Sequence, residues 1–290
     1  MRQIGILQAL VSGLCFGFLG IFGKWAYQAE LRPGEFLALR FVVAASVLGI
    51  LLALFSRSSL RLPKKVIFQC LLLGIMGYAL FSSCYFYALE GLSASLTVLL
   101  LYTYPVYVTL ASVVFLKEKF RLQHGIALPV MGVGMAALVW GEMAIRSSTS
   151  LAFGFLSALF YSVYILISSR VIRGHSAYGC VFFIMMGAGI TLSLLHLRAE
   201  TFPIASLGWM AVGGASLIST IVAMALFLAA LQKITNTETA LLSTAEPLSG
   251  VLLASLFLGE SFSPLQWMGG FLLISGMTVV ALAKLEKGER

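Results

Sequence analysis

The chain has 290 residues, of which 60% are hydrophobic and only 10% are charged, against the roughly 25% charged residues of an average soluble domain. A formal net charge of +8 accompanies this composition. These values exclude an ordinary soluble enzyme and indicate an integral membrane protein.

Ten apolar segments follow one another along the chain. Eight contain no Asp, Glu, Lys or Arg, whereas the second contains Arg40 and the ninth contains Glu246. Each is about as long as the 20 residues that a helix needs to cross some 30 Å of hydrocarbon, and none alternates as the strands of a membrane barrel do. We therefore predict an all-α integral membrane protein with ten transmembrane helices, at 3–23, 36–56, 66–89, 91–116, 122–141, 147–169, 174–197, 201–232, 239–259 and 261–283.

The basic residues predict the orientation of these helices. If the N-terminus is cytoplasmic, fourteen of the nineteen Lys and Arg residues fall on the cytoplasmic side, as the positive-inside rule requires. Both termini are then cytoplasmic. Because the positive charge is spread over short loops and forms no single patch, it gives no support to a nucleic-acid partner.

The two halves of the chain resemble each other at an offset of 142 residues. The segment that begins at Thr97 aligns without a gap with the segment that begins at Thr239, and the shared residues include Pro105 with Pro247, Glu118 with Glu260 and Phe120 with Phe262. We infer a duplication of five helices, with repeats at 1–141 and 147–290. Since five is odd, the second repeat enters the membrane from the opposite side, which is typical of secondary transporters that open a central site alternately to each face.

Three stretches of the chain and one pair of residues resemble the drug/metabolite transporter superfamily, in particular its EamA-type ten-helix members. They are "ALRFVVA" at 38–44, "ALEGLSASLTVLL" at 88–100, "ALQKITNTETALLSTAEPLSGVLLASLFLGE" at 230–260, and the paired Glu118 and Glu260. Within the superfamily, the length and the aromatic residues of the helices are most similar to the YddG group of aromatic amino acid exporters.

The resemblance implies a secondary transporter in a bacterial-type inner membrane, and no enzyme. It would export small organic solutes, above all aromatic or hydrophobic amino acids, through a central cavity between the repeats. Export of other metabolites or of cationic drugs is the alternative within the superfamily, and an intramembrane enzyme or a receptor is the alternative outside it. The lipid bilayer and a small-molecule substrate are the expected partners, and protons are a candidate coupling ion. No nucleotide-binding or metal-ligand motif is found in the sequence, so no cofactor or metal is predicted.

Polar and aromatic residues recur on single faces of five predicted helices. Gly74, Tyr78, Ser82 and Tyr85 share one face of the third helix, at spacings that bring residues together in an α-helix. Their mates in the eighth are Ser216, Thr220, Met224 and Phe227. Such residues also serve plain helix packing, but the matched faces favour a cavity. The predicted substrate-binding residues are Tyr78, Ser82, Tyr85, Thr97, Tyr104, Tyr161, Tyr164, Thr220, Ser243 and Glu246.

Glu246 stands directly before Pro247 in an otherwise uncharged run. An ionised carboxylate facing lipid is costly, so it should face the bundle interior or a wet cavity. Three roles are open: it can anchor a substrate ammonium group, carry a coupling proton, or pair with Lys24 or Arg40. We expect Arg40 to extend to the outer surface, and the glycines before Lys24 either to pack helices or to border the pathway.

Glu118 and Glu260 each precede a predicted helix, where a carboxylate offsets the positive end of the helix dipole. We expect both to cap the following helix or to brace the adjacent loop. The four cysteines lie within apolar runs and form no CxxC pair, which is typical of packing residues.

Overall fold

The computed structural model describes residues 1–140, 145, 147–198, 201–202, 204–258 and 263–282. The described elements are helices, apart from an isolated β-bridge between Leu92 and Ile145. Nine helical spans in this part of the chain are long and apolar enough to cross a membrane, and Leu122–Leu138 forms a further, shorter apolar helix. The prediction of an all-α membrane protein is confirmed, with nine to ten spans.

Several of the spans consist of more than one helical segment. In chain order the segments are α1 (Arg2–Gly17), α2 (Leu19–Gln28), α3 (Pro33–Phe55), α4 (Arg57–Leu60), α5 (Lys64–Leu72), η1 (Leu73–Ala79), α6 (Leu80–Gly91), α7 (Ala94–Leu101), α8 (Tyr104–Leu116), α9 (Leu122–Leu138), α10 (Ser148–Val171), α11 (Ala177–His196), α12 (Ser206–Ser216), η3 (Leu217–Val222), α13 (Ala223–Leu231), α14 (Asn236–Leu242), α15 (Ala245–Leu258) and α16 (Pro264–Leu282).

Local sequence signals fix several of the helix starts. α3 begins with Pro33, and the Glu35 carboxylate accepts a hydrogen bond of 2.8 Å from the backbone N–H of Arg32. α14 begins with a capping box in which the Thr235 hydroxyl accepts from Glu238 N–H while the Glu238 carboxylate accepts from Thr235 N–H. These bonds satisfy backbone donors that a helix start leaves without partners.

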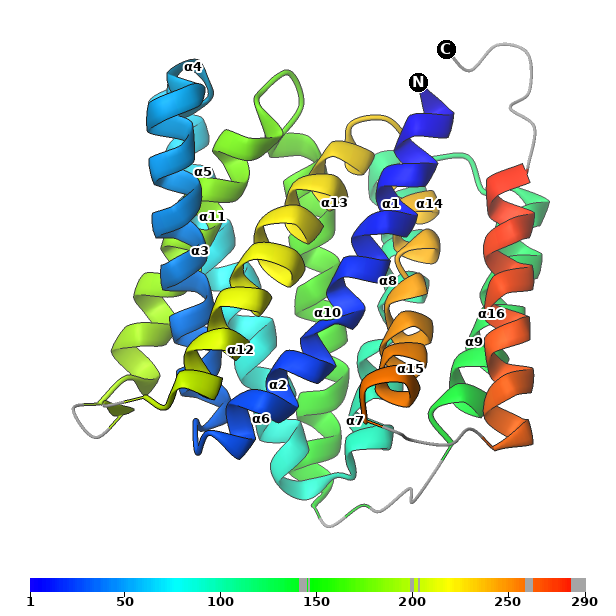
Figure 1. The fold of residues 1–290 in the computed structure, drawn as a ribbon. Helices are drawn as coiled ribbons and strands as arrows, with labels where there is room; N and C mark the ends of the chain where they lie inside the picture. The colour runs from blue at the N-terminus through cyan, green and yellow to red at the C-terminus, as the bar shows by residue number, and fades with distance from the viewer. Residues whose placement is uncertain (141–144, 146, 199–200, 203, 259–262, 283–290) are drawn as a thin grey trace.

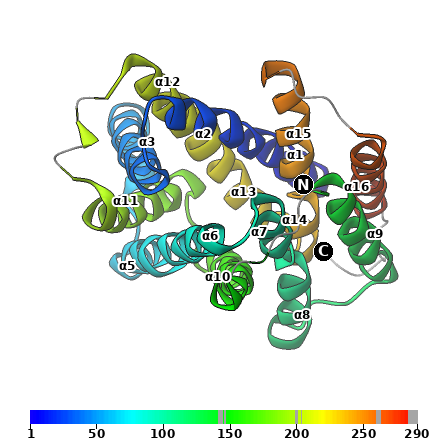
Figure 2. The ribbon, with the colours of Figure 1, turned by 90° about the horizontal axis from the view of Figure 1, so that it is seen from below.

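The helices pack in pairs that join the two halves of the chain. α9 lies along α16, α3 along α11, and α6 along α10, while α1 contacts both α13 and α15. Figure 1 shows the α9 and α16 pair at one end of the bundle and α3, α5 and α11 at the other. In Figure 2, α1, α2, α12 and α13 form a band across the middle between these groups.

Interruptions of the helices occur at corresponding places in the two halves. Tyr102 and Thr103 separate α7 from α8, and Ser243 and Thr244 separate α14 from α15, within two residues of the 142-residue offset. Pro105 and Pro247 follow these breaks; a proline lacks an N–H and its ring displaces the carbonyl four residues earlier, which ends the preceding segment. The π-helical segments η1 and η3 also correspond within two residues.

Two faces of the bundle are distinguished by where the chain begins. The N-terminus and the last described residue of α16, Leu282, lie on one face, which we call the N-terminal face (Figure 1). The end of α2 at Gln28 lies on the opposite face, which we call the distal face. The first residue of the chain and the last described residue therefore lie on the same side of the bundle.

Candidate functional site

A cavity of about 410 Å³ lies in the middle of the bundle. It is bordered by α1 and α2, α3, η1 and α6, α7 and α8, α10, and α15. From the interruption between α14 and α15 it extends to Lys24 and Tyr27, which are exposed at the end of α2, so it opens toward the distal face. Its volume lies within the usual range for small-molecule sites.

Aromatic rings form one wall of the cavity. The ring centroids of Tyr104 and Tyr161 are 4.8 Å apart, as are those of Phe81 and Tyr161, and those of Tyr78 and Phe81 are 4.7 Å apart. Tyr164 lies behind this wall, with its ring 5.6 Å from that of Tyr78. Such rings give a rigid apolar surface with hydroxyl groups at its edge, which suits a solute that carries a flat ring.

Glu246 lies on the side of the cavity formed by α15. It belongs to the first turn of α15, where the positive end of the helix dipole stabilises a negative charge. Glu246 is half-buried and borders the cavity, and its carboxylate interacts with the Tyr102 hydroxyl. The sequence Glu-Pro is thus the start of a half-helix that begins inside the membrane span.

Arg40 also borders the cavity and is only 1% exposed. Its Nη2 atom donates to the Tyr78 hydroxyl at 3.2 Å, and its guanidinium carbon lies 4.6 Å from the centroid of the Phe41 ring. Its Nε and Nη1 atoms have no hydrogen-bond partner. The expectation that Arg40 extends to the outer surface is therefore wrong. It is an inward-facing cation in a site where an unpaired charge costs several kcal/mol.

Glu246 and Arg40 do not neutralise each other in this structure. Among the described residues they form no ion pair within 4.0 Å, although they interact through the electrostatic field. Lys24 lies in the wall of the same cavity, nearer the distal face. The site therefore presents separated positive and negative groups beside a wall of aromatic rings.

Six of the ten predicted site residues border the cavity, namely Tyr78, Ser82, Tyr85, Tyr104, Tyr161 and Glu246. The remaining four, Thr97, Tyr164, Thr220 and Ser243, are buried outside it. The hydroxyls of Thr97, Thr220 and Ser243 donate to carbonyls of their own helices at 2.8 to 2.9 Å. A hydroxyl that bonds its own backbone needs no cavity, which is why polarity alone misplaces these residues.

The matched face of the eighth predicted helix is packed rather than open. Ser216 donates to the carbonyl of Arg40 at 2.9 Å, and none of Ser216, Thr220, Met224 and Phe227 borders the cavity. Gly74 is also elsewhere: a Cβ atom there would lie 2.7 Å from the backbone nitrogen of Ala188. Gly74 thus packs η1 closely against α11.

Several residues of the cavity were not predicted, including Phe81, Tyr102 and the inward-facing Arg40. Tyr102 stands two residues from Tyr104, so an unbroken helix would place the two on different faces. Both border the cavity because the helix is interrupted between α7 and α8. The signal that could have revealed Tyr102 is Pro105, which ends the preceding segment.

The glycines of the first span divide between two roles. A Cβ atom on Gly13 would lie 2.9 Å from Ala245 Cβ, so Gly13 packs α1 against α15. Gly20 and Gly23 have no atom within 4 Å of the equivalent position and border the cavity. Glycines that pack helices together and glycines that border the cavity are therefore both present along one helical span.

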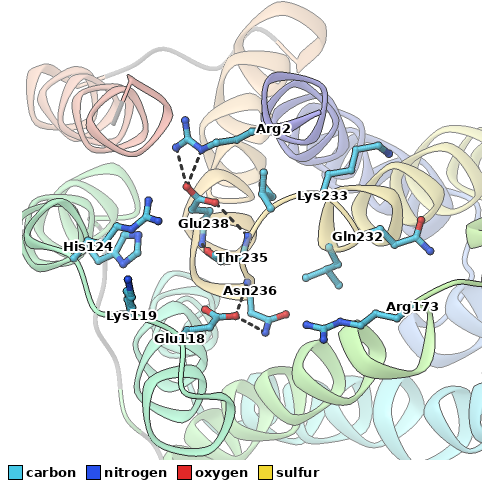
Figure 3. Close-up of a pocket in the computed structure, with 13 residues that line it drawn as sticks. Arg2, Glu118, Lys119, His124, Arg173, Gln232, Lys233, Thr235, Asn236 and Glu238 are labelled. Carbon is cyan, nitrogen blue, oxygen red and sulfur yellow. Dashed lines mark hydrogen bonds and ion pairs between the residues drawn. The ribbon is translucent and has the colours of Figure 1, made fainter. Parts of the chain in front are cut away.

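A second pocket, of about 490 Å³, lies at the N-terminal face (Figure 3). Glu238 accepts two hydrogen bonds from Arg2, at 2.7 and 3.2 Å. Glu118 accepts from the backbone N–H and the side-chain amide of Asn236, at 3.1 and 2.8 Å, and from the Thr237 hydroxyl at 3.2 Å. We call these five residues, Arg2, Glu118, Asn236, Thr237 and Glu238, the latch.

The latch separates the two roles expected of Glu118: the carboxylate braces the loop that contains it and does not cap the helix that follows. It caps α14, which belongs to the other half of the chain, and not α9, which follows it. Glu260 lies outside the described residues. In the part of the chain that the structure describes, the pocket and the central cavity have no lining residue in common. The latch thus joins α1, α14 and the segment after α8 at the N-terminal face, whereas the cavity opens toward the distal face.

One family model matches the chain in two places, and the relatives named below are transporters. The sequence matches the model of the EamA-like transporter family over residues 3–140 and 148–282. It is 24% identical to the pseudopaline exporter CntI of Pseudomonas aeruginosa, over 99% of both chains. It is 24% identical to the uncharacterized inner membrane transporter YicL of Salmonella typhimurium, over 96% of this chain and 95% of the relative. A solved crystal structure matches with a TM-score of 0.80 at 21% identity, over 96% of both chains, which is a likeness of fold.

Proposed function

The chain belongs to the EamA-like transporter family, and on that premise we propose that it is a secondary transporter that exports amino acids with aromatic or hydrophobic side chains. The observation that carries this proposal is the central cavity. It combines a wall of aromatic rings with a carboxylate, Glu246, that is suited to a substrate ammonium group. The proposal places the protein in a bacterial-type inner membrane.

Alternating access of two inverted five-helix repeats, at 1–141 and 147–290, is the proposed mechanism. The separate family matches over 3–140 and 148–282, and the corresponding helix interruptions, support the duplication. A cavity open to the distal face and a latch on the N-terminal face support one access state of such a cycle. In a bundle that is open on one face only, the two repeats have different conformations. This difference accounts for the packed face of α12 and α13, whose counterpart in the first repeat borders the cavity.

The orientation of the cycle rests on the basic residues of the second pocket. Arg2, Lys119, Arg121, Arg173 and Lys233 all line it. Since cytoplasmic loops retain Lys and Arg, we propose that the N-terminal face is cytoplasmic, with both termini there. The cavity then faces the outside of the cell, in the state that releases an exported solute.

The substrate and the direction of transport each have one support. The aromatic wall of the cavity favours ring-bearing solutes, in keeping with the proposed similarity to the YddG group of aromatic amino acid exporters. One relative, CntI, is named as a pseudopaline exporter, which supports export as the direction of transport. Other metabolites or cationic drugs are the alternative cargo, since a carboxylate beside aromatic rings also suits an organic cation.

The test of the proposed function is counterflow in vesicles that contain only this protein. Vesicles loaded with unlabelled L-phenylalanine should accumulate labelled L-phenylalanine in a saturable manner. Vesicles that contain the protein but no unlabelled L-phenylalanine should not. Repeating the assay with a pH gradient tests protons as the coupling ion. Saturable counterflow of organic cations without any counterflow of amino acids would replace the amino acid proposal by the cationic alternative.

Removal of a ring from the cavity wall should change selectivity. We expect Tyr161→Ala to lower counterflow of L-phenylalanine severalfold more than that of L-valine, because the lost stacking surface serves the ring of the substrate. Tyr178→Ala is the matched control, since Tyr178 is 55% exposed and does not border the cavity. Equal losses for the two amino acids in Tyr161→Ala would contradict an aromatic-ring site.

Removal of the latch should open the N-terminal face. We expect Glu118→Ala to increase maleimide labelling from that face about tenfold, at a cysteine introduced at buried Ser243 in a background without the native cysteines. A hydrogen bond to a charged group contributes about 1.5–3 kcal/mol, and about 1.4 kcal/mol shifts a population tenfold. Glu90→Ala, at an exposed position outside the latch, is the control. Unchanged labelling in Glu118→Ala would show that the latch does not hold the face closed.

A further inference from the structure

Arg40 is the buried charged group of the cavity that the proposed function leaves without a task. Its guanidinium has five N–H donors and stays protonated in proteins. In this structure one nitrogen, Nη2, bonds the Tyr78 hydroxyl, while Nε and Nη1 have no hydrogen-bond partner. A guanidinium presents paired N–H groups that match the two oxygens of a carboxylate. Each of these pairs includes Nη2, which has a second N–H besides the one that bonds Tyr78, so Nη2 together with Nε or Nη1 can still donate to the two oxygens of an anion.

The chain does not supply that anion itself. Glu246, the carboxylate that borders the same cavity, forms no ion pair with Arg40 in the described structure, and it faces the Tyr102 hydroxyl. Tyr78, which accepts a hydrogen bond from the guanidinium, and Phe41, whose ring lies against it, are both neutral. Glu35, five residues before Arg40 on α3, has its carboxylate occupied by Arg32 N–H and the Thr201 hydroxyl.

The position of Arg40 links it to the rest of the site. It lies on α3, and the tyrosine that holds it, Tyr78, belongs to the aromatic wall that also contains Tyr161. Glu246 borders the cavity from α15. A solute in the cavity can thus meet a cation, an anion and a set of rings at once.

We infer that Arg40 binds the carboxylate of the transported solute while Glu246 binds its ammonium group, so that the cavity selects zwitterions. This inference rests on the proposed function and narrows its substrate class. A ring-bearing cation without a carboxylate leaves Arg40 unpaired, and a ring-bearing acid without an ammonium group leaves Glu246 unpaired. Both kinds of compound bind more weakly than the amino acid with the same ring, because a buried group without its partner opposes binding.

The experiment compares three compounds that share one ring: L-phenylalanine, phenethylamine, which lacks the carboxylate, and 3-phenylpropionate, which lacks the ammonium group. Each competes with labelled L-phenylalanine for purified wild-type protein, Arg40→Met, Arg40→Lys and Glu246→Gln. In the wild type we expect L-phenylalanine to bind at least about tenfold more tightly than either analogue. This arm needs no variant, and equal binding of L-phenylalanine and phenethylamine by the wild type overturns the inference.

The variants assign the preference to particular residues. Arg40→Met should bind L-phenylalanine about tenfold more weakly, bind phenethylamine as the wild type does, and lose 3-phenylpropionate, while Arg40→Lys should recover part of the loss. Glu246→Gln should lose phenethylamine but keep 3-phenylpropionate. Arg57→Met, at an arginine on the surface, is the control for removal of an arginine. If Arg40 only positions Tyr78, Arg40→Met weakens all three compounds alike, and the inference is overturned.

Thermal stability gives a second readout that does not depend on flux. Without ligand, Arg40→Met should unfold at the wild-type temperature or above it, because the substitution removes an unpaired buried charge. A large fall in that temperature would mark Arg40 as a structural ion-pair partner and overturn the inference.

The proposed function and the inference about Arg40 can also fail independently of each other. Arg40-dependent binding of 3-phenylpropionate without amino acid counterflow rejects the proposed function, and saturable counterflow that Arg40→Met leaves unchanged rejects the inference.

Discussion

Replacement of Glu246 by glutamine is expected to lower amino acid counterflow at least about tenfold in a protein that still folds and inserts. The substitution keeps the shape of the side chain and removes its charge. A charge-assisted hydrogen bond to a substrate ammonium group contributes on the order of 1.5–3 kcal/mol, and about 1.4 kcal/mol corresponds to a factor of ten. The measurement is counterflow of L-phenylalanine at matched amounts of protein in the vesicles.

The environment of Glu246 supports folding of this variant. Glu246 lies in the first turn of α15, is half-buried and borders the cavity, and the Tyr102 hydroxyl that interacts with it can donate equally to a glutamine carbonyl oxygen. Glu90→Gln, at an exposed glutamate outside the cavity, is the matched control. Unchanged counterflow in Glu246→Gln would leave this carboxylate as a structural partner. Loss of folded protein in both Glu246→Gln and Lys24→Met, rescued in the double variant, would then identify Lys24 as that partner.

Replacement of Gly17 by alanine is expected to lower both stability and counterflow, whereas the same change at Gly20 should leave stability unaltered. A Cβ atom on Gly17 would meet the Ser249 hydroxyl and would lie 2.8 Å from the backbone nitrogen of Gly250 and 2.9 Å from the carbonyl oxygen of Glu246. Backbone cannot rotate away, so α15 must move from α1. Overpacking of this kind typically costs about 1–3 kcal/mol.

Gly17→Ala should affect transport because α15 contains Glu246. Movement of α15 displaces Glu246 from the cavity, so Gly17→Ala should lose counterflow even in the fraction of protein that folds. Gly20 is three residues further along the same span and has open space at the equivalent position. Thermal unfolding of the two variants in detergent, followed by counterflow at matched protein, tests the difference. Equal stability of Gly17→Ala and Gly20→Ala would show that α1 and α15 are less closely packed than the structure indicates.

The amino acid sequence by itself determined the class of the protein and the approximate bounds of its membrane spans. Runs of about 20 apolar residues form helices in a bilayer, because a helix satisfies the hydrogen bonds of its backbone groups within the segment. The helix interruptions before Pro105 and Pro247 likewise have a local cause, since a proline ends the preceding helical segment whatever its neighbours are. Glu246 was recognisable for the same reason: a charge within an apolar run must avoid lipid wherever the helix lies.

Only the tertiary structure decided which polar residues share a space. The sequence leaves open whether the Arg40 side chain extends to the distal face or points into the bundle. The packing of α3 against α11 and α12 turns it inward. The same packing covers Ser216 and Thr220, whose spacing equals that of the open face of Tyr78 and Ser82. Glu118 caps α14 across the two halves of the chain. Such contacts join residues far apart in sequence, and helical periodicity describes one helix only, so it predicts a face but not what that face meets.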